Sequence, residues 1–190
     1  MTRRLFIALA LPDEVKAELA RTREQLASRR DRINWVRDGQ LHLTLRFLGE
    51  TEDRLVPDLE RVLEQLAKDH AAPALRLGEP GIFGPPSAPR VLWVGLKGAT
   101  RDLEALAGSL EKQLRRLGLP PSEHGFKAHL TIGRVKSCRD DLAAAHLRHP
   151  PLPLPMRLRE LLLIESRLRP EGAEHHVLTR HILGTEASTA

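Results

Sequence analysis

Apolar and polar residues follow two distinct periods along the chain, which predict short strands separated by helices. Residues 5–9 (LFIAL) and 92–96 (LWVGL) are brief, continuous apolar runs of the kind found in buried strands. Behind each run, apolar residues recur every three or four positions, over 15–26 and over 103–117. That spacing gives a helix one apolar face, which can pack on the strands. The chain is therefore expected to alternate strands and helices.

The order of these elements repeats in the second half of the chain. A helical pattern at 52–69 has a shorter counterpart at 140–147. Strand candidates at 74–79 and 157–166 follow them. Each half then reads strand, helix, strand, helix, strand, so the sequence predicts an internal repeat.

The repeat predicts an α+β fold in which residues 1–190 form a single bilobal domain. Its two halves would be related by a pseudo-twofold axis, each an antiparallel sheet with flanking helices, and a cleft would lie between them. A last strand is expected at 175–183. The polar end of the chain, residues 185–190, is expected to be a disordered tail.

The composition excludes several classes of protein. An apolar fraction of 41% and a charged fraction of 29% are typical of a globular protein rather than a disordered one. The apolar run near the N-terminus ends at Pro12 and Asp13, and no run approaches the roughly 18–20 residues that cross a bilayer. We therefore expect no membrane association. The single cysteine, Cys138, cannot form an internal disulfide and fits a reducing cytoplasm.

The charge balance indicates a polyanionic partner. The chain carries 30 lysines and arginines against 25 acidic residues, a net charge of +5, and its sequence pI is close to 10.0. A basic surface attracts polyanions, nucleic acid above all. The charge does not identify which nucleic acid.

The candidate chemistry lies in a pattern that occurs twice, 87 residues apart: LHLTLRFLGE at 41–50 and AHLTIGRV at 128–135. Side chains in a strand alternate between its two faces, so His42 and Thr44 would share one face with Arg46. The leucines between them would face the core. The second copy has the same alternation, and a pseudo-twofold axis can bring both polar faces to one cleft.

Two imidazoles and two hydroxyls suit the hydrolysis of a phosphodiester. One neutral imidazole can take a proton from the attacking water, while the other, as imidazolium, protonates the departing oxygen. The hydroxyls of Thr44 and Thr131 can donate hydrogen bonds to the phosphate oxygens as negative charge builds. Arg46 would add positive charge at the wall of the cleft. This chemistry needs no metal.

Other interpretations of the histidines remain open. Each histidine can be structural and bond its neighbouring threonine. A zinc site is disfavoured because neither motif has the spacing of zinc ligands, so we expect no metal and no cofactor. A non-catalytic module that binds RNA ends is disfavoured because arginine or lysine would keep its charge at neutral pH. Trp35 and Trp93 are expected to pack in the core.

The motifs and their flanking segments resemble a known family along nearly the whole chain. The segments are RLFIALALP (4–12), HLTLRFLGE (42–50), PRVLWVGL (89–96), HLTIGRV (129–135) and ESRLRPEGAEHHVL (165–178). They are similar to the bacterial and archaeal RNA 2′,3′-cyclic phosphodiesterases, once named 2′-5′ RNA ligases, of the two-histidine (2H) phosphoesterase superfamily. The resemblance implies a bilobal α+β fold with an open cleft. It also implies metal-independent hydrolysis of a terminal 2′,3′-cyclic phosphate to a 2′-phosphomonoester, with 2′-5′ ligation as the reverse reaction.

The resemblance also implies a role for each residue of the two motifs. His42 would be the proton donor to the O3′ leaving group, and His129 the proton acceptor that activates water. Thr44 and Thr131 would bind the phosphate. Because the motif is nearly symmetric, the resemblance and not the chemistry assigns the two histidines to their roles.

The family places an aromatic or basic residue five positions after each histidine, and here these are Phe47 and Arg134. Phe47 would stack on the terminal base, and Arg134 would contact the phosphate. Alternation along a strand puts both on the face opposite the histidines, unless a bulge intervenes.

The partner implied by the resemblance is RNA with a 2′,3′-cyclic phosphate end, tRNA fragments among the candidates, with no obligatory protein partner. Two features depart from the family. Ala128 stands where the family commonly has proline, and His175-His176 stand where it usually has a tyrosine. The alternative within the same chemistry is a related phosphodiesterase for 2′-5′ oligonucleotides or small cyclic nucleotides.

Overall fold

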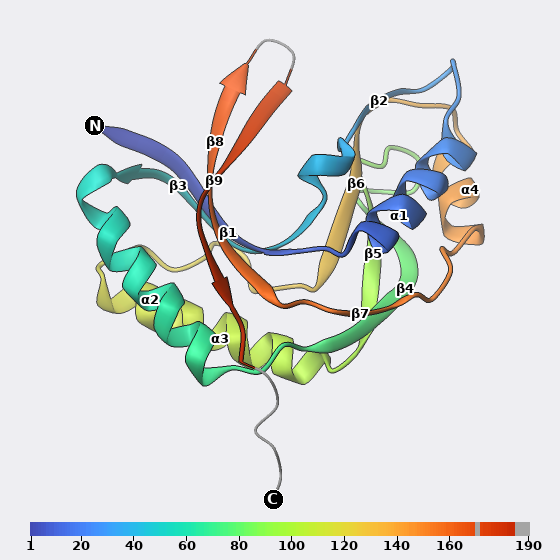
Figure 1. Cartoon of the computed structure of the whole chain (residues 1–190). Coiled ribbons are helices and arrows are strands. Elements are labelled where there is room, and N and C mark those ends of the chain that lie inside the picture. The colour runs from blue at the N-terminus through green and yellow to red at the C-terminus, as the bar shows by residue number, and fades with distance from the viewer. Residues whose placement is uncertain (170–171, 185–190) are drawn as a thin grey trace, which may run out of the picture.

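The computed structural model describes residues 1–169 and 172–184, which form two antiparallel β-sheets (Figure 1). Sheet A has the strand order β3-β1-β8-β9, and sheet B has the order β2-β6-β5-β4-β7. The strands of sheet A are β1 (Thr2–Ala10), β3 (His42–Glu52), β8 (Glu160–Arg169) and β9 (Gly172–Ile182). The strands of sheet B are β2 (Arg32–Trp35), β4 (Ala74–Phe83), β5 (Val91–Gly98), β6 (His129–Ser137) and β7 (Pro155–Arg157).

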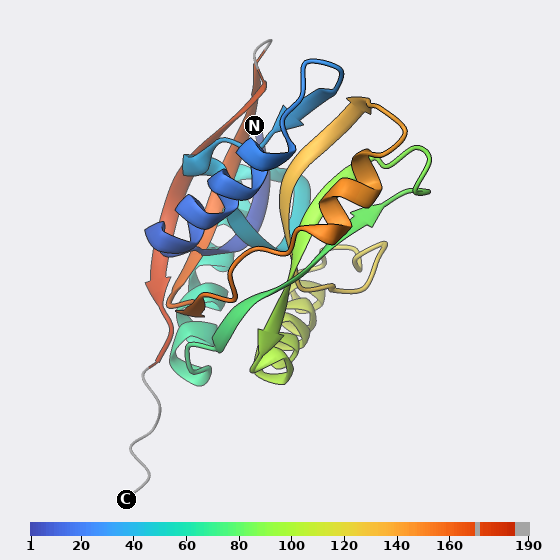
Figure 2. The ribbon, with the colours of Figure 1, turned by 90° about the vertical axis from the view of Figure 1, so that its right-hand side faces the viewer.

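Four α-helices and two 3₁₀ turns connect the described strands. The helices are α1 (Asp13–Leu26), α2 (Val56–Asp69), α3 (Thr100–Arg116) and α4 (Leu142–Arg148). The 3₁₀ turns span Asp38–Gln40 and Asp53–Leu55. Helices α2 and α3 contact each other and cover one face of sheet A, while α1 and α4 contact each other over sheet B (Figure 2).

Each sheet is packed by a helix that follows a strand of the other sheet. Helix α1 follows β1 of sheet A but packs beside β6 of sheet B, and α3 follows β5 of sheet B but packs beside β3 of sheet A. The strand order β3-β1-β8 in sheet A corresponds to the order β6-β5-β4 in sheet B. In both sheets the motif strand pairs with the first strand of its half, β1 or β5. The exchange of helices ties the two sheets together around one large apolar core.

The helices bury the apolar faces that their spacing predicts. In α3 the buried residues are Leu103, Leu106, Ala107, Leu110 and Leu114. They belong to the same core as Leu5, Ile7 and Leu9 of β1, all 1% exposed or less. Burying one such leucine stabilises the fold by about 1.5–3 kcal/mol. The other face of sheet A has its own small apolar cluster, which includes Phe6 and Ala8; we call this side of the sheet its inner face.

The expected fold class is confirmed: the protein is α+β, with two antiparallel sheets and helices on their outer faces. The expectation that each half forms its own sheet is wrong, because β8 and β9 join sheet A while β2 and β4 join sheet B. Three further details differ from the sequence prediction. The candidate strand at 157–166 is divided between β7 in sheet B and β8 in sheet A, because the chain crosses from one sheet to the other at 158–159. The short strand β2 was not expected. Helix α2 starts at Val56, after a 3₁₀ turn, rather than at residue 52.

The expected tail at 185–190 lies outside the described residues. Within the described ranges, no helix is both long enough and apolar enough to cross a membrane. The treatment of the whole chain as one bilobal domain stays a prediction.

Candidate active site

His42 and Thr44 begin β3 on the inner face of sheet A. Their neighbours Leu43 and Leu45 are buried in the core at 0% and 7% exposure, whereas the histidine and the threonine are only partly buried. In the register with β1, His42 is paired with Ala10 and Thr44 with Ala8. Directly paired residues lie on one face of an antiparallel sheet. Both polar side chains therefore stand on the same side as the inner apolar cluster, away from the helices.

His129 and Thr131 have the corresponding position on β6 of sheet B. Leu130 and Ile132 are buried, and the two polar side chains are partly buried. The register pairs His129 with Gly95 and Thr131 with Trp93 of β5. The two motif strands contact each other where the sheets meet. Both motif strands therefore begin in the region where the two sheets meet (Figure 1).

An irregularity of the strand occurs at the same place in both motifs. Between Thr44 and Arg46 the register with β1 shifts, which leaves Leu45 without a partner; between Thr131 and Gly133 the register with β5 shifts at Ile132. An extra residue in one strand is a β-bulge, and it changes which face the following residues point to. The two bulges are equivalent, three residues after each histidine.

The bulges bring the residues five positions after the histidines onto the inner faces. Phe47 is paired with Phe6, and Arg134 with Val91. These two partners lie on the same sheet faces as the residues paired with His42 and His129. Phe47 is 56% exposed, and its ring lies 5.6 Å from that of Phe6. The bulges, which simple alternation does not predict, thus place Phe47 on the face of His42 and Arg134 on the face of His129.

The expectation that Arg46 shares the face of His42 is wrong. The same bulge pairs Arg46 with Ile7, a core residue on the helix-covered face. Its Nε lies 3.0 Å from a carboxylate oxygen of Glu111 on α3, and its side chain is only 13% exposed. Another guanidinium nitrogen donates to the carbonyl of Pro120. Arg46 fastens α3 and the chain after it to the outside of sheet A.

The surroundings of His42 are apolar rings and another imidazole. Its ring centroid lies 4.9 Å from that of Phe6 and 5.5 Å from that of His175 on β9. The pKa of His42 is lowered from 6.5 to about 4, first by burial and then by the positive charge of His175, while a backbone hydrogen bond with Gln40 opposes both. In the free protein the His42 imidazole is therefore neutral near pH 7.

The surroundings of His129 are aromatic and cationic. Its ring centroid lies 5.0 Å from that of Phe83 and 6.1 Å from that of Trp93. Its Nδ1 lies 2.7 Å from the carbonyl oxygen of Lys127, to which a protonated Nδ1 donates. Burial lowers the pKa of His129, the bond to this carbonyl raises it, and the charges of Lys127 and Arg134 lower it.

Both histidines thus bond the backbone of the residue two positions before them. A bond from Nδ1 to a carbonyl fixes the tautomer, and at His129 it leaves Nε2 for a substrate. In the described ranges neither Thr44 nor Thr131 makes a side-chain hydrogen bond, to its histidine or to another group. The two hydroxyls are therefore not used to hold the imidazoles, as a purely structural interpretation would require.

The sequence missed several neighbours of the two histidines. The sequence marks His175 only as a departure from the family, but its ring lies beside that of His42. Its Nδ1 is buried without a hydrogen-bond partner in the described structure. Trp93 was expected in the core, but the bulge at Ile132 pairs it with Thr131 on the inner face. Lys127 stands over the rings of Phe83 and Trp93, with its Nζ 4.5 Å from the latter centroid. Trp35, in contrast, packs against the core as expected.

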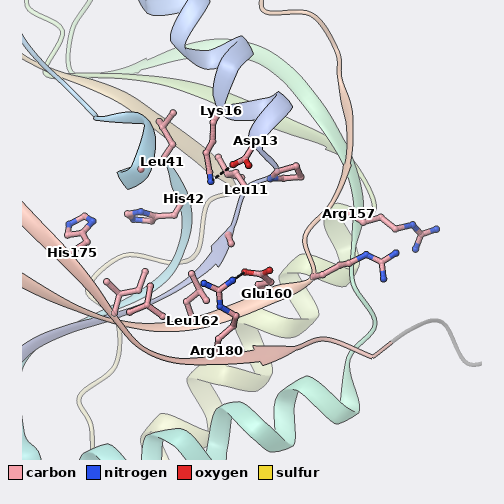
Figure 3. A pocket seen from close by; sticks show the side chains of 16 residues that line it. Leu11, Asp13, Lys16, Leu41, His42, Arg157, Glu160, Leu162, His175 and Arg180 are labelled. Atoms are coloured by element: carbon pink, nitrogen blue, oxygen red, sulfur yellow. Dashed lines mark hydrogen bonds and ion pairs between the residues drawn. The ribbon is translucent and has the colours of Figure 1, made fainter.

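A cavity of about 490 Å³ opens on one side of His42 (Figure 3). It includes His175 and residues of α1, β7, β8 and β9, but it does not reach the second motif. No group of three histidine, cysteine or acidic side chains is placed to hold a metal ion in residues 1–169 and 172–184. The metal-free, cofactor-free chemistry inferred from the sequence stays a prediction.

Comparisons with known proteins converge on one group. Residues 11–169 match the family model described as the 2′-5′ RNA ligase superfamily. A protein of Archaeoglobus fulgidus named RNA 2′,3′-cyclic phosphodiesterase is 32% identical over 171 residues, 89% of this chain and 94% of that protein. A Thermus thermophilus protein with the same name is 32% identical over 191 residues, 96% of this chain and 91% of that protein.

Two solved structures have the same fold along almost the whole chain. The crystal structure of the Thermus thermophilus protein TT0787 has a TM-score of 0.83 and 31% sequence identity, and the match covers 97% of this chain and all of that one (100%). The structure of Escherichia coli LigT complexed with 3′-AMP has a TM-score of 0.74 and 28% identity, and covers 96% of this chain and 99% of LigT.

Proposed function

Because the chain belongs to the 2′-5′ RNA ligase superfamily, we propose that it hydrolyses the 2′,3′-cyclic phosphate at RNA ends to a 2′-phosphomonoester by metal-independent two-histidine catalysis. Relatives that match 89% and 96% of the chain are named for the 2′,3′-cyclic phosphodiesterase activity. The protein is a hydrolase that acts on phosphodiester bonds. Its proposed substrates are RNA fragments in the cytoplasm, tRNA fragments among them.

One observation carries the proposal: two equivalent strand starts each present a histidine, a threonine and the residue after a bulge on an inner face. The two strands contact each other, and the proposed reaction requires that one phosphate lie within reach of both histidines. A structural duplication would not need free hydroxyls. A binding module would gain more from arginines than from two imidazoles that burial keeps neutral.

The proposed reaction assigns one proton transfer to each histidine. Neutral His129 takes a proton from water through Nε2, and the water oxygen forms a bond to phosphorus. The bond from phosphorus to O3′ breaks, and protonated His42 gives its proton to O3′. The product carries a 2′-phosphate and a 3′-hydroxyl. The excess proton on His129 and the missing proton on His42 then exchange with solvent, which restores the starting state.

The pKa of His42 bears directly on its role as the acid. A pKa of about 4 leaves few molecules protonated at neutral pH before the substrate binds. The negative charge of a bound cyclic phosphate raises the pKa of a nearby imidazole, which offsets the effects of burial and of His175. The substrate thus helps to create the protonated acid that its own cleavage requires.

The remaining inner-face residues are proposed to bind the substrate. The hydroxyls of Thr44 and Thr131 donate to the non-bridging oxygens as charge builds on them. Arg134 adds a permanent positive charge beside His129. Phe47 exposes its ring on the side of His42 and is available to stack on the terminal base.

The test is a short RNA that ends in a 2′,3′-cyclic phosphate, incubated with the protein in EDTA. Chromatography against 2′- and 3′-phosphate standards identifies the product. We expect a 2′-phosphate, lost in His42→Ala and in His129→Ala but not in His149→Ala, which changes an exposed histidine outside the site. Activity that needs added metal would overturn the mechanism. If the protein hydrolyses only 2′-5′ oligonucleotides or cyclic mononucleotides, these become its proposed substrates. If it hydrolyses none of these compounds, a non-catalytic module that binds RNA ends is favoured.

A further inference from the structure

The cavity beside His42 has a composition that the hydrolytic chemistry does not explain. In Figure 3, His175 and His42 lie at one end, Lys16 reaches in from α1, and Arg180 and Arg157 lie toward the other end. The second motif contributes nothing to its walls. A volume of about 490 Å³ is within the usual range for small-molecule sites and is larger than a phosphate needs.

The rim of the cavity is cationic. Its charged residues are Lys16, Arg157, Arg159 and Arg180 against Asp13 and Glu160. Both acids are already paired: Asp13 lies 2.9 Å from Lys16, and Glu160 accepts from Arg180. An ammonium has three donors and a guanidinium five, so each cation keeps donors for a further anion. In the described part of the chain the exposed Arg159 makes no ion pair.

The floor of the cavity is apolar. It consists of Ala10 and Leu11 at the end of β1, and of Leu162, Ile164 and Val177 on β8 and β9. Helix α1 points its first turn at the same space, with Pro12 at its N-cap and no side chain capping its amides. The acidic Asp13 and Glu14 of this first turn offset the positive end of the helix, so the cationic character of the rim comes from its lysine and arginines.

A nucleotide matches both properties of the cavity, because the flat face of its base can pack on apolar side chains and its phosphate is negatively charged. The chain of an RNA substrate must leave the terminal ribose on its 5′ side, and this cavity adjoins the imidazole that would protonate O3′. We propose that the cavity is the binding site for the nucleotide preceding the terminal one, with the connecting phosphate held by Lys16 and Arg159. This inference rests on the proposed function.

The test compares two substrates that differ by one nucleotide. A nucleoside 2′,3′-cyclic monophosphate has no phosphate on its 5′ side, and a dinucleotide with the same cyclic end has one. We expect the wild type to prefer the dinucleotide by about tenfold in kcat/KM, and Lys16→Gln with Arg159→Gln to reduce that ratio to near one. The ratio for Arg101→Gln should equal that of the wild type, because this exposed arginine lies on α3 and outside the cavity.

A change in the substrate separates this role from a general loss of stability. A dinucleotide with an uncharged methylphosphonate linkage removes the same interaction from the other side. Since both changes remove one interaction, their effects should not add. The salt dependence of kcat/KM for the charged dinucleotide should also become less steep in the variant, by about 0.7 in the double-logarithmic slope for each phosphate that is no longer neutralised.

Equal kcat/KM for the two substrates, or a preference that persists with the uncharged linkage, would overturn the inference and leave the proposed function intact. Failure of the wild type to hydrolyse either substrate would instead remove the proposed function itself. If the double variant still preferred the dinucleotide, the connecting phosphate would bind elsewhere. That result would contradict the assignment of Lys16 and Arg159.

Discussion

The sites of His42 and His129 share their backbone but differ in what surrounds the rings. Each histidine starts a strand, bonds the backbone two residues earlier, and is followed by a bulge at the third position. The neighbours of His42 are Phe6 and His175, whereas His129 is surrounded by Phe83, Trp93 and Lys127.

The difference between the two sites lies in the kind of charge that each imidazole meets. Lys127 and Arg134 act on His129 with charges that are permanent at physiological pH, whereas His175, which acts on His42, can itself lose its proton. The field at His129 is therefore constant, and the field at His42 depends on pH and on what is bound. Two similar backbone segments can thus hold identical side chains in electrostatically different sites, a difference that the proposed opposite proton transfers require.

The largest expected effect is the loss of either imidazole. His42→Ala and His129→Ala should each reduce kcat by about 10²–10⁴, because each removes one of the two groups proposed to transfer protons. The double variant should be little worse than the single ones, since the two act in one step. Single-turnover kinetics on an RNA with a cyclic phosphate end would measure this. Full additivity would show that the two sites work independently.

The next effect is on stability. The pKa of His42 is about 4 in the folded protein against 6.5 in the unfolded chain, so above pH 6.5 both states are neutral and the folded state keeps its full stability. As the pH falls from 6.5 to 4, the unfolded chain takes up a proton that the folded protein does not, and the free energy of unfolding decreases. At about 1.4 kcal/mol per pKa unit, His42 contributes on the order of 3 kcal/mol to this loss.

Chemical denaturation of the wild type and of His42→Gln between pH 7 and pH 4 tests this sign. The variant should lose less stability on acidification than the wild type. His149→Gln, at an exposed position, is the matched control and should follow the wild type. A wild type that becomes more stable as the pH falls would contradict the assignment.

A smaller effect should separate two arginines that the bulges place on opposite sides of their sheets. Arg134→Gln should raise KM about tenfold, since a charged hydrogen bond to phosphate contributes about 1.5–3 kcal/mol and 1.4 kcal/mol is a factor of ten. Arg46→Gln should leave KM unchanged and lower the free energy of unfolding by about 1–3 kcal/mol, because it removes the partly buried bond to Glu111. If Arg46→Gln raised KM and Arg134→Gln lowered only the free energy of unfolding, the bulges would not determine which sheet face each arginine occupies.

The smallest effect concerns the charge next to each imidazole. His175→Gln should raise the pKa of His42 and leave that of His129 alone, because only His42 meets the charge of His175. Lys127→Gln should raise the pKa of His129 and leave that of His42 unchanged. NMR titration of the histidine ring signals reads both values in each variant. If either substitution moves both pKa values equally, the two sites share one field and the comparison fails.

The periodicity of the sequence predicted the elements, but it did not predict for every motif residue which face of the sheet it occupies. His42, Thr44, His129 and Thr131 precede the bulges, so alternation placed them correctly. Phe47 and Arg134 follow a bulge, and alternation put them on the wrong face; the resemblance to the family pointed to them nonetheless. Arg46 was assigned to the inner face by alternation and lies on the outer one, because the register shifts at Leu45.

The sequence by itself determined the α+β class, the order of most strands and helices, and the two motifs, because these depend on local periodicity and on short segments that recur. Only the tertiary structure decided which helix covers which sheet, where the bulges turn the strands, and that His175 lies beside His42. These depend on contacts between residues far apart in the chain, such as the 5.5 Å between the rings of His42 and His175, on which no local pattern reports. The pKa of an imidazole follows from such contacts, since burial and neighbouring charges set it.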